Sequence, residues 1–143
     1  MNRQIKFRGF TTHFDKGRVY GLLSVKNTID EMTNFGWVSE TIVEESSIGQ
    51  FTGFRDRNDV DIYEGDVVEE YLFGFPIFSV IEWNDENGCF GKRQIRIVDD
   101  TEEEKRNGMF TDIHKWNCKN SMVIGNIFEN NYKEKIKCSQ QSL

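Results

Sequence analysis

The sequence predicts an all-β (mainly β) fold of short strands and tight turns, on three observations. Apolar and polar residues alternate over several short stretches, as in strands that bury one face. Twelve Phe, four Tyr and three Trp provide bulky side chains that favour strands. No long segment repeats its apolar residues at the 3.6-residue period of a helix. Helix is therefore expected to be scarce.

The N-terminal third is expected to begin with a β-hairpin. Alternation over Gln4–Phe10 predicts a strand, Asp15-Lys16-Gly17 predicts a turn, and Val19–Val25 predicts the returning strand. Residues 27–35 fit either a loop or a short helical turn. Short strand pieces are expected at 37–38 and 42–43.

The middle of the chain has the pattern of a small barrel. Gly49 and Gly53 lie in a predicted strand over 48–54, where glycines mark bulges or the close backbone approach of a barrel corner. Asx residues predict a turn at 56–59, because they tolerate left-handed backbone. A second turn at 64–66 precedes a β-rich run over 67–73. Short strands and tight turns of this kind are typical of small barrels.

The C-terminal half predicts fewer and less regular elements. Strands are expected over 76–83, near 89–90, over 95–98 and over 122–128, with a turn at 84–88. The charged segment 99–108 is expected to be a mobile loop, and the polar residues 130–143 a frayed tail.

Charge is distributed unevenly along the 143 residues, whose net charge is −6. Residues 1–26 carry six basic and one acidic side chain, whereas residues 27–70 carry twelve acidic and two basic ones. Opposite charges of this kind favour self-attraction, within one chain or between copies. The simpler interpretation, favoured for most of these residues, is that they keep exposed strand faces solvated. No apolar run is long enough to span a membrane, and three widely spaced cysteines indicate a reducing compartment.

Three segments carry a resemblance to a known family. They are Ile5–Phe10 (IKFRGF), Ser47–Val68 (SIGQFTGFRDRNDVDIYEGDVV) and Val123–Asn130 (VIGNIFEN). In order and spacing they resemble the YopX family of phage and prophage proteins. The resemblance implies an SH3-like barrel and no catalytic residue to transfer. With no apolar run for a membrane span or a signal peptide, the protein is expected in the cytoplasm of the bacterial host cell. Asn58-Asp59-Val60 and Asn131 depart from the family's usual turn residues.

This resemblance and the strand pattern predict three regions. Residues 1–45 form an N-terminal β-hairpin region that packs on the barrel, residues 46–130 form the SH3-like barrel, and residues 131–143 form a polar C-terminal tail.

Few residues suggest catalysis or metal binding. Asp56, Asp59, Asp61, Glu64 and Asp66 are close in sequence, but strand alternation sends neighbouring carboxylates to opposite faces, so turn and solvated edge roles are expected. His114 and Cys118 lack the further ligands that zinc needs. No nucleophile motif or glycine-rich phosphate loop is present. No enzyme activity, metal or cofactor is expected.

The basic N-terminal hairpin is the candidate binding site. Lys6, Arg8, Lys16 and Arg18 alternate with aromatic residues, as on β surfaces that bind single-stranded nucleic acid. Alternation also allows the aromatics to face the core and the cations to face water, and an acidic chain binds nucleic acid weakly. The leading hypothesis is a protein-interaction or self-assembling phage accessory protein, a homo-oligomer or a ligand of a phage or host protein. The alternative is a nucleic-acid-binding accessory protein.

Overall fold

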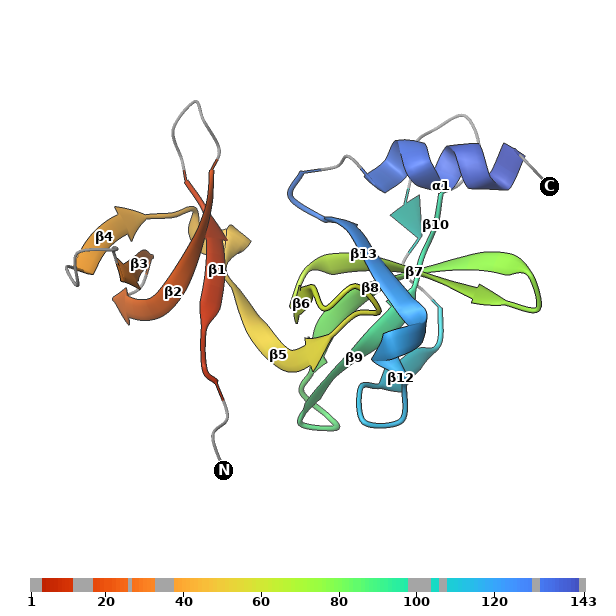
Figure 1. Cartoon of the computed structure of the whole chain (residues 1–143), viewed down its shortest axis with the longest axis horizontal. Coiled ribbons are helices and arrows are strands. Elements are labelled where there is room, and N and C mark those ends of the chain that lie inside the picture. The colour runs from red at the N-terminus through yellow and green to blue at the C-terminus, as the bar shows by residue number, and fades with distance from the viewer. Residues whose placement is uncertain are drawn as a thin grey trace. The chain divides into compact units, whose positions relative to one another are not determined.

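The computed structural model places the chain in two compact units, Met1–Gly53 and Phe54–Leu143. It describes residues 4–11, 17–25, 27–32, 38–97, 104–105, 108–129 and 132–141. Both units are mainly β, so the predicted class is confirmed (Figure 1). Strand β5 (Gly49–Arg55) runs across the division between the two units, and the predicted boundary after residue 45 stays a prediction.

Four strands and the start of β5 make the sheet of the first unit. They are β1 (Phe7–Phe10), β2 (Arg18–Val25), β3 (Thr28–Met32) and β4 (Val38–Ile42), in the order β4-β3-β2-β1-β5. A short 3₁₀ turn, η1 (Glu45–Ser47), precedes β5. The predicted hairpin is confirmed, since β1 pairs antiparallel with β2 from Phe7↔Gly21 to Phe10↔Arg18. Val19, Ile29 and Val43 form the core of this unit.

Strand β3 lies where the sequence was read as a loop or a short helical turn. Asp30 and Glu31 are poor strand formers, so the local sequence does not predict a strand here. Ile29 is fully buried, and β3 is paired on both sides, by β2 and by β4. Burial and two ladders of hydrogen bonds therefore override the local propensity.

The second unit is built on a five-stranded antiparallel sheet of order β12-β9-β8-β7-β13. Its strands are β7 (Asp66–Leu72), β8 (Phe75–Asn84), β9 (Cys89–Gln94), β12 (Phe110–Asp112) and β13 (Ser121–Asn126). Strand β6 (Asp61–Tyr63) pairs with β5, β10 (Arg96–Ile97) pairs with β11 (Glu104–Lys105), and η2 (Cys118–Asn120) is a 3₁₀ turn. Strand β12 was not predicted.

Each face of this sheet packs a separate core. Val67, Phe78 and Val80 on one face contact helix α1 (Tyr132–Gln141). Val68 and Ile81 on the other face pack with Trp116 and neighbouring residues. Strand alternation explains the division, because successive side chains of β7 point to opposite faces.

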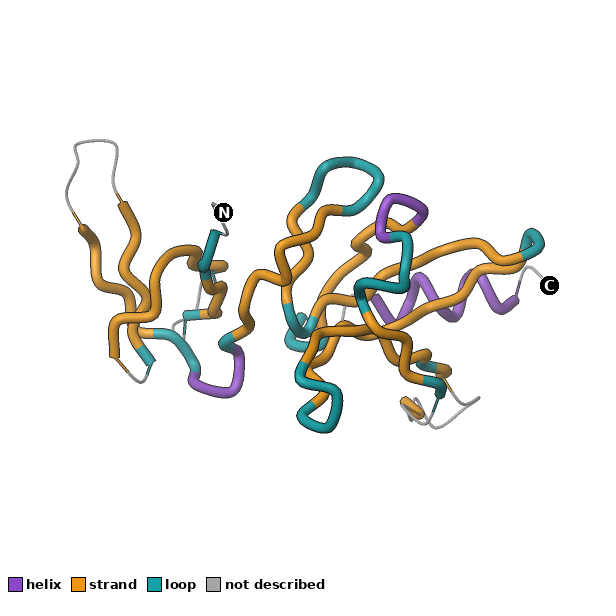
Figure 2. Tube along the Cα trace, turned by 90° about the horizontal axis from the view of Figure 1, so that it is seen from below, coloured by secondary structure: helices purple, strands orange, loops and turns teal. Residues whose placement is uncertain are grey.

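The C-terminal segment is a helix, so the predicted frayed tail is wrong. Tyr132 and Ile136, four residues apart, share one helical face and are at most 1% exposed within the core beside β7 and β8. Figures 1 and 2 show α1 lying along one face of the second unit's sheet. Two large buried side chains anchor a helix whose remaining surface is polar.

The SH3-like barrel is not confirmed. In the part of the chain that the structure describes, the strands form sheets of six, two and five members and no closed barrel. The five-stranded sheet ends at β12 and β13, which remain its edges. Among the described residues, no helix is long and apolar enough to cross a membrane.

Candidate functional site

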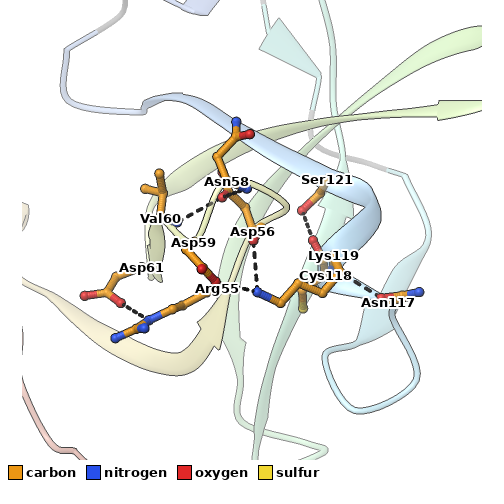
Figure 3. Close-up of polar contacts among 10 residues, drawn as sticks. All are labelled: Arg55, Asp56, Asn58, Asp59, Val60, Asp61, Asn117, Cys118, Lys119 and Ser121. Carbon is orange, nitrogen blue, oxygen red and sulfur yellow. Dashed lines mark hydrogen bonds and ion pairs between the residues drawn. The ribbon is translucent and has the colours of Figure 1, made fainter.

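The turn between β5 and β6 is organised around one buried carboxylate. Asp56 is fully buried, and its Oδ1 accepts hydrogen bonds from the backbone N–H of Asn58 at 2.8 Å and of Val60 at 3.0 Å. Its Oδ2 accepts the N–H of Val123 in β13 at 2.8 Å. Figure 3 shows the turn folded around this side chain. Asp56 therefore closes the turn and ties it to β13.

Exposed charges surround the same turn. The ammonium of Lys119 donates to Oδ1 of Asp59 at 2.8 Å and to the carbonyl of Asp56 at 3.3 Å. This ammonium lowers the pKa of Asp59, which adopts a left-handed φ of 60°. Arg55 pairs with Asp61 at 2.8 Å (Figure 3). These contacts fix the shape of the turn.

The rest of the acidic cluster also serves the fold. Asp66 is 1% exposed, and its Oδ2 accepts the N–H of Tyr63 at 2.8 Å, so its predicted role as a solvated edge charge is wrong. Tyr63 is buried, so its N–H needs an acceptor within the fold, and Asp66 provides it across the Glu64–Gly65 turn. Within the described ranges, no three His, Cys, Asp or Glu side chains come together as a metal site.

The predicted basic binding residues do not form one solvated surface. Arg8 is 4% exposed, so its predicted place facing water is wrong, whereas Arg18 is exposed. Strand β1 lies between β2 and β5, so both of its edges are paired within the sheet. The Lys6 ammonium lies 4.5 Å from the centroid of the Phe51 ring, and Lys16 lies outside the described residues. Nucleic-acid binding by this hairpin stays a prediction.

His114 and Cys118 are not brought together as ligands. Cys118 is buried, and this burial raises the pKa of its thiol to about 11. His114 is exposed, and its ring contacts Phe54 edge-on at 5.7 Å between centroids. A protonated, buried thiol is a poor nucleophile and a poor metal ligand.

Sequence analysis missed a half-buried charged group on one face of the sheet. Glu70 accepts hydrogen bonds from the ammonium of Lys92 and, at 2.8 Å, from the indole N–H of Trp116. The ammonium also lies 5.0 Å from the centroid of the Trp116 ring, and burial lowers the pKa of Lys92. Residues 22 to 46 positions apart in sequence meet here, so no local spacing indicates them. Both charges are neutralised within the fold.

The tip of the β7–β8 hairpin presents apolar side chains to solvent. Phe73 is 92% exposed, and Tyr71, Leu72 and Phe75 are each more than half exposed. Leu72 pairs with Phe75, and Tyr71 pairs with Pro76, so these pairs place apolar groups on both faces of the hairpin. We call residues 71–77 the hairpin arm. It extends past the rest of the second unit's sheet (Figures 1 and 2).

The backbone of the arm's turn is strained by its sequence. Phe73 has a φ of 51° and Gly74 a φ of 83°, as in the two-residue turns that favour Asn-Gly. A left-handed conformation is uncommon for a bulky residue and costs roughly 1 kcal/mol. Because Phe73 is almost fully exposed, burial in its own chain does not offset this cost.

A family model described as YopX protein matches residues 6–132. The chain belongs to the YopX family. The match spans both the Asp56 turn and the hairpin arm of this YopX-family chain. Membership indicates a phage-type protein and assigns no molecular activity. A search of curated proteins finds no match.

Proposed function

We propose that this YopX-family protein is a non-enzymatic protein-interaction module that docks through its hairpin arm. The observation that carries the proposal is the exposure of Tyr71, Leu72, Phe73 and Phe75 at one protruding tip. From typical side-chain areas, these four residues expose roughly 500 Å² of mainly apolar surface. Contiguous patches of that size on soluble proteins often mark binding sites.

The composition of the arm also supports binding to protein. Three of its four exposed tip residues are aromatic, and aromatic side chains are enriched at the centres of protein interfaces. The turn keeps Phe73 at the tip in spite of its backbone cost. Burial against a partner offsets that cost, whereas water does not.

The described charged clusters offer less support for catalysis. Asp56 accepts three backbone hydrogen bonds, and Glu70 and Lys92 neutralise each other. General acids and bases need an accessible proton at the reacting group. A binding role for the arm therefore remains the better-supported function.

Photo-crosslinking tests the proposal. A benzophenone amino acid replaces Phe73 in one variant and Val60 in a matched control, because Val60 is also an exposed apolar turn residue, 47% exposed. In phage-infected or lysogenic cells, position 73 is expected to crosslink to a discrete protein, and position 60 is not. The crosslinked protein is then purified and titrated with the wild-type chain and with Phe73→Asn.

The expected result is saturable binding that Phe73→Asn weakens at least about tenfold. Equal crosslinking from positions 60 and 73, or a dissociation constant unchanged by Phe73→Asn, would refute docking through the arm.

A further inference from the structure

We infer that the hairpin arm binds a second copy of this chain and forms a dimer in which the two arms pack against each other. This inference deepens the proposed function and rests on it, since it names the partner of the arm. The two-fold arrangement is the usual one for homodimers, because one surface then meets its own copy.

The distribution of charge in the second unit favours a second copy of the chain as the partner of the arm. Residues 54–143 contain 18 acidic and 12 basic side chains, so the second unit carries a formal charge of −6. Yet Tyr71 to Ile81 are eleven consecutive uncharged residues. A site for a basic protein is expected to present carboxylates at its tip, and the arm presents none. The arm instead suits an uncharged apolar surface, which a second arm provides.

The charges at the base of the arm do not oppose a second copy. Glu70 is neutralised by Lys92 and bonded to Trp116. Glu69 hydrogen-bonds to Tyr71, and this bond raises the pKa of the tyrosine hydroxyl. Glu70 therefore adds no net charge where two arms meet, and arms that overlap at their tips leave the Glu69 carboxylates at the two bases.

The length of the arm allows the two acidic units to stay apart. The ladder of β7 with β13 ends at Glu70, and the ladder of β8 with β9 begins at Ser79. Two strand residues beyond Glu70, Tyr71 and Leu72, extend the arm by roughly 7 Å, and the turn at Phe73-Gly74 adds to that length. Overlapping arms then separate the two sheets by about one Debye length at physiological salt, roughly 8 Å. Repulsion between the units is partly screened at that distance.

The exposed area of the arm's tip limits the expected affinity of the dimer. The arm presents apolar groups on both faces, so each copy buries at most its roughly 500 Å² and the interface totals at most about 1,000 Å², the lower limit for a specific complex. We therefore expect a reversible dimer with a dissociation constant in the micromolar range.

Sedimentation velocity of the purified full chain tests this dimer, over about two decades of concentration around 10 μM. The wild type is expected to change reversibly from monomer to dimer. Phe73→Asn is expected to weaken the dimer at least about tenfold. It removes the most exposed apolar group and creates the Asn-Gly pair that this turn favours, so misfolding does not explain the loss. Phe75→Thr, which keeps a strand-forming residue, is the second test variant.

Met109→Asn is the matched control, because Met109 is 79% exposed and lies outside the arm. It is expected to dimerise like the wild type. Raising the salt concentration is expected to leave the dimer unchanged or strengthen it, because salt screens repulsion between acidic units.

A wild-type chain that is monomeric at every concentration would overturn the inference. A dimer that forms equally well in Phe73→Asn would also overturn it. So would a dimer that dissociates at high salt, because that behaviour indicates pairing between opposite charges. A monomer that binds phosphatidylethanolamine–phosphatidylglycerol vesicles through Phe73 would overturn it in favour of a membrane surface. If the monomeric chain crosslinks from position 73 to another protein, the inference fails and the proposed function stands. If the arm makes no contact of any kind, both fail.

Discussion

Two turns of the second unit place a non-glycine residue in left-handed backbone, and the two turns differ in what this residue does. Asp59 lies in the β5–β6 turn at a φ of 60°, and Phe73 lies in the β7–β8 turn at a φ of 51°. Asp tolerates this conformation and is paired with Lys119, next to a buried Asp56 that bonds three backbone groups. Phe73 is strained and almost fully exposed. The first turn is thus built to hold the fold, and the second is built to make contact.

The largest expected effect on the free energy of unfolding comes from removing the Asp56 carboxylate, which holds the first turn together. Asp56→Ala leaves the N–H groups of Asn58, Val60 and Val123 without their acceptor, and we expect a loss of about 3–5 kcal/mol of unfolding free energy. Urea denaturation monitored by Trp fluorescence measures it. Asp56→Asn keeps the shape and one acceptor oxygen, so its loss is expected to be clearly smaller. Equal losses for the two variants would show that hydrogen bonding does not explain the role of Asp56.

The second effect appears at alkaline pH, at the buried thiol behind the same turn. The pKa of Cys118 is raised from 9.0 to about 11, so the folded chain keeps a proton that the unfolded chain releases above pH 9. The unfolding free energy therefore falls as pH rises from 9 to about 11. The loss attributable to the thiol is about 2 kcal/mol.

Other groups titrate in that range, so the wild type is compared with Cys118→Ala. The stability difference between the two is expected to shrink with rising pH. A difference that stays constant between pH 9 and about 11 would contradict a buried, protonated Cys118.

These effects help to separate what the sequence can predict from what it cannot. The Asx-rich turn at 56–59 was predictable, because its residues carry their own turn chemistry. The turn at Phe73-Gly74 was not, because Phe gives no turn signal and the run Val67–Phe73 continues as strand in its pattern. Exposure of the arm depends on where β9 and β13 stop pairing, which no local pattern contains.

Burial of individual side chains was hardest to predict in segments that are rich in polar and charged residues. Alternation placed Arg8 in water, whereas Arg8 is 4% exposed, because alternation gives the face on which a side chain lies and not whether that face is covered. The acidic residues of β3 and the polar surface of α1 concealed Ile29, Tyr132 and Ile136 as core residues. The prediction of a mainly β class was correct in spite of these errors, because aromatic content and period-two alternation are properties of the whole chain.

A smaller effect concerns the exposed side of the anchored turn. The side chains of Lys119 and Asp59 are 59% and 79% exposed, so Lys119→Ala is expected to lower the unfolding free energy only slightly. The cost should decrease in high salt, because screening weakens the pair in the wild type. Urea titrations of both chains at low and high salt measure it. A cost that grows with salt would exclude an ion pair as its source.

The unfolding free energy of Phe73→Asn tests the contrast between the two turns most directly. It is measured against the wild type by urea denaturation, at a concentration low enough for both chains to be monomeric. Because the substitution relieves left-handed strain and removes no internal contact, we expect stability to be equal or to rise by about 0.5–1 kcal/mol. A loss of more than about 1 kcal/mol would mean that Phe73 packs on its own chain and belongs to the fold.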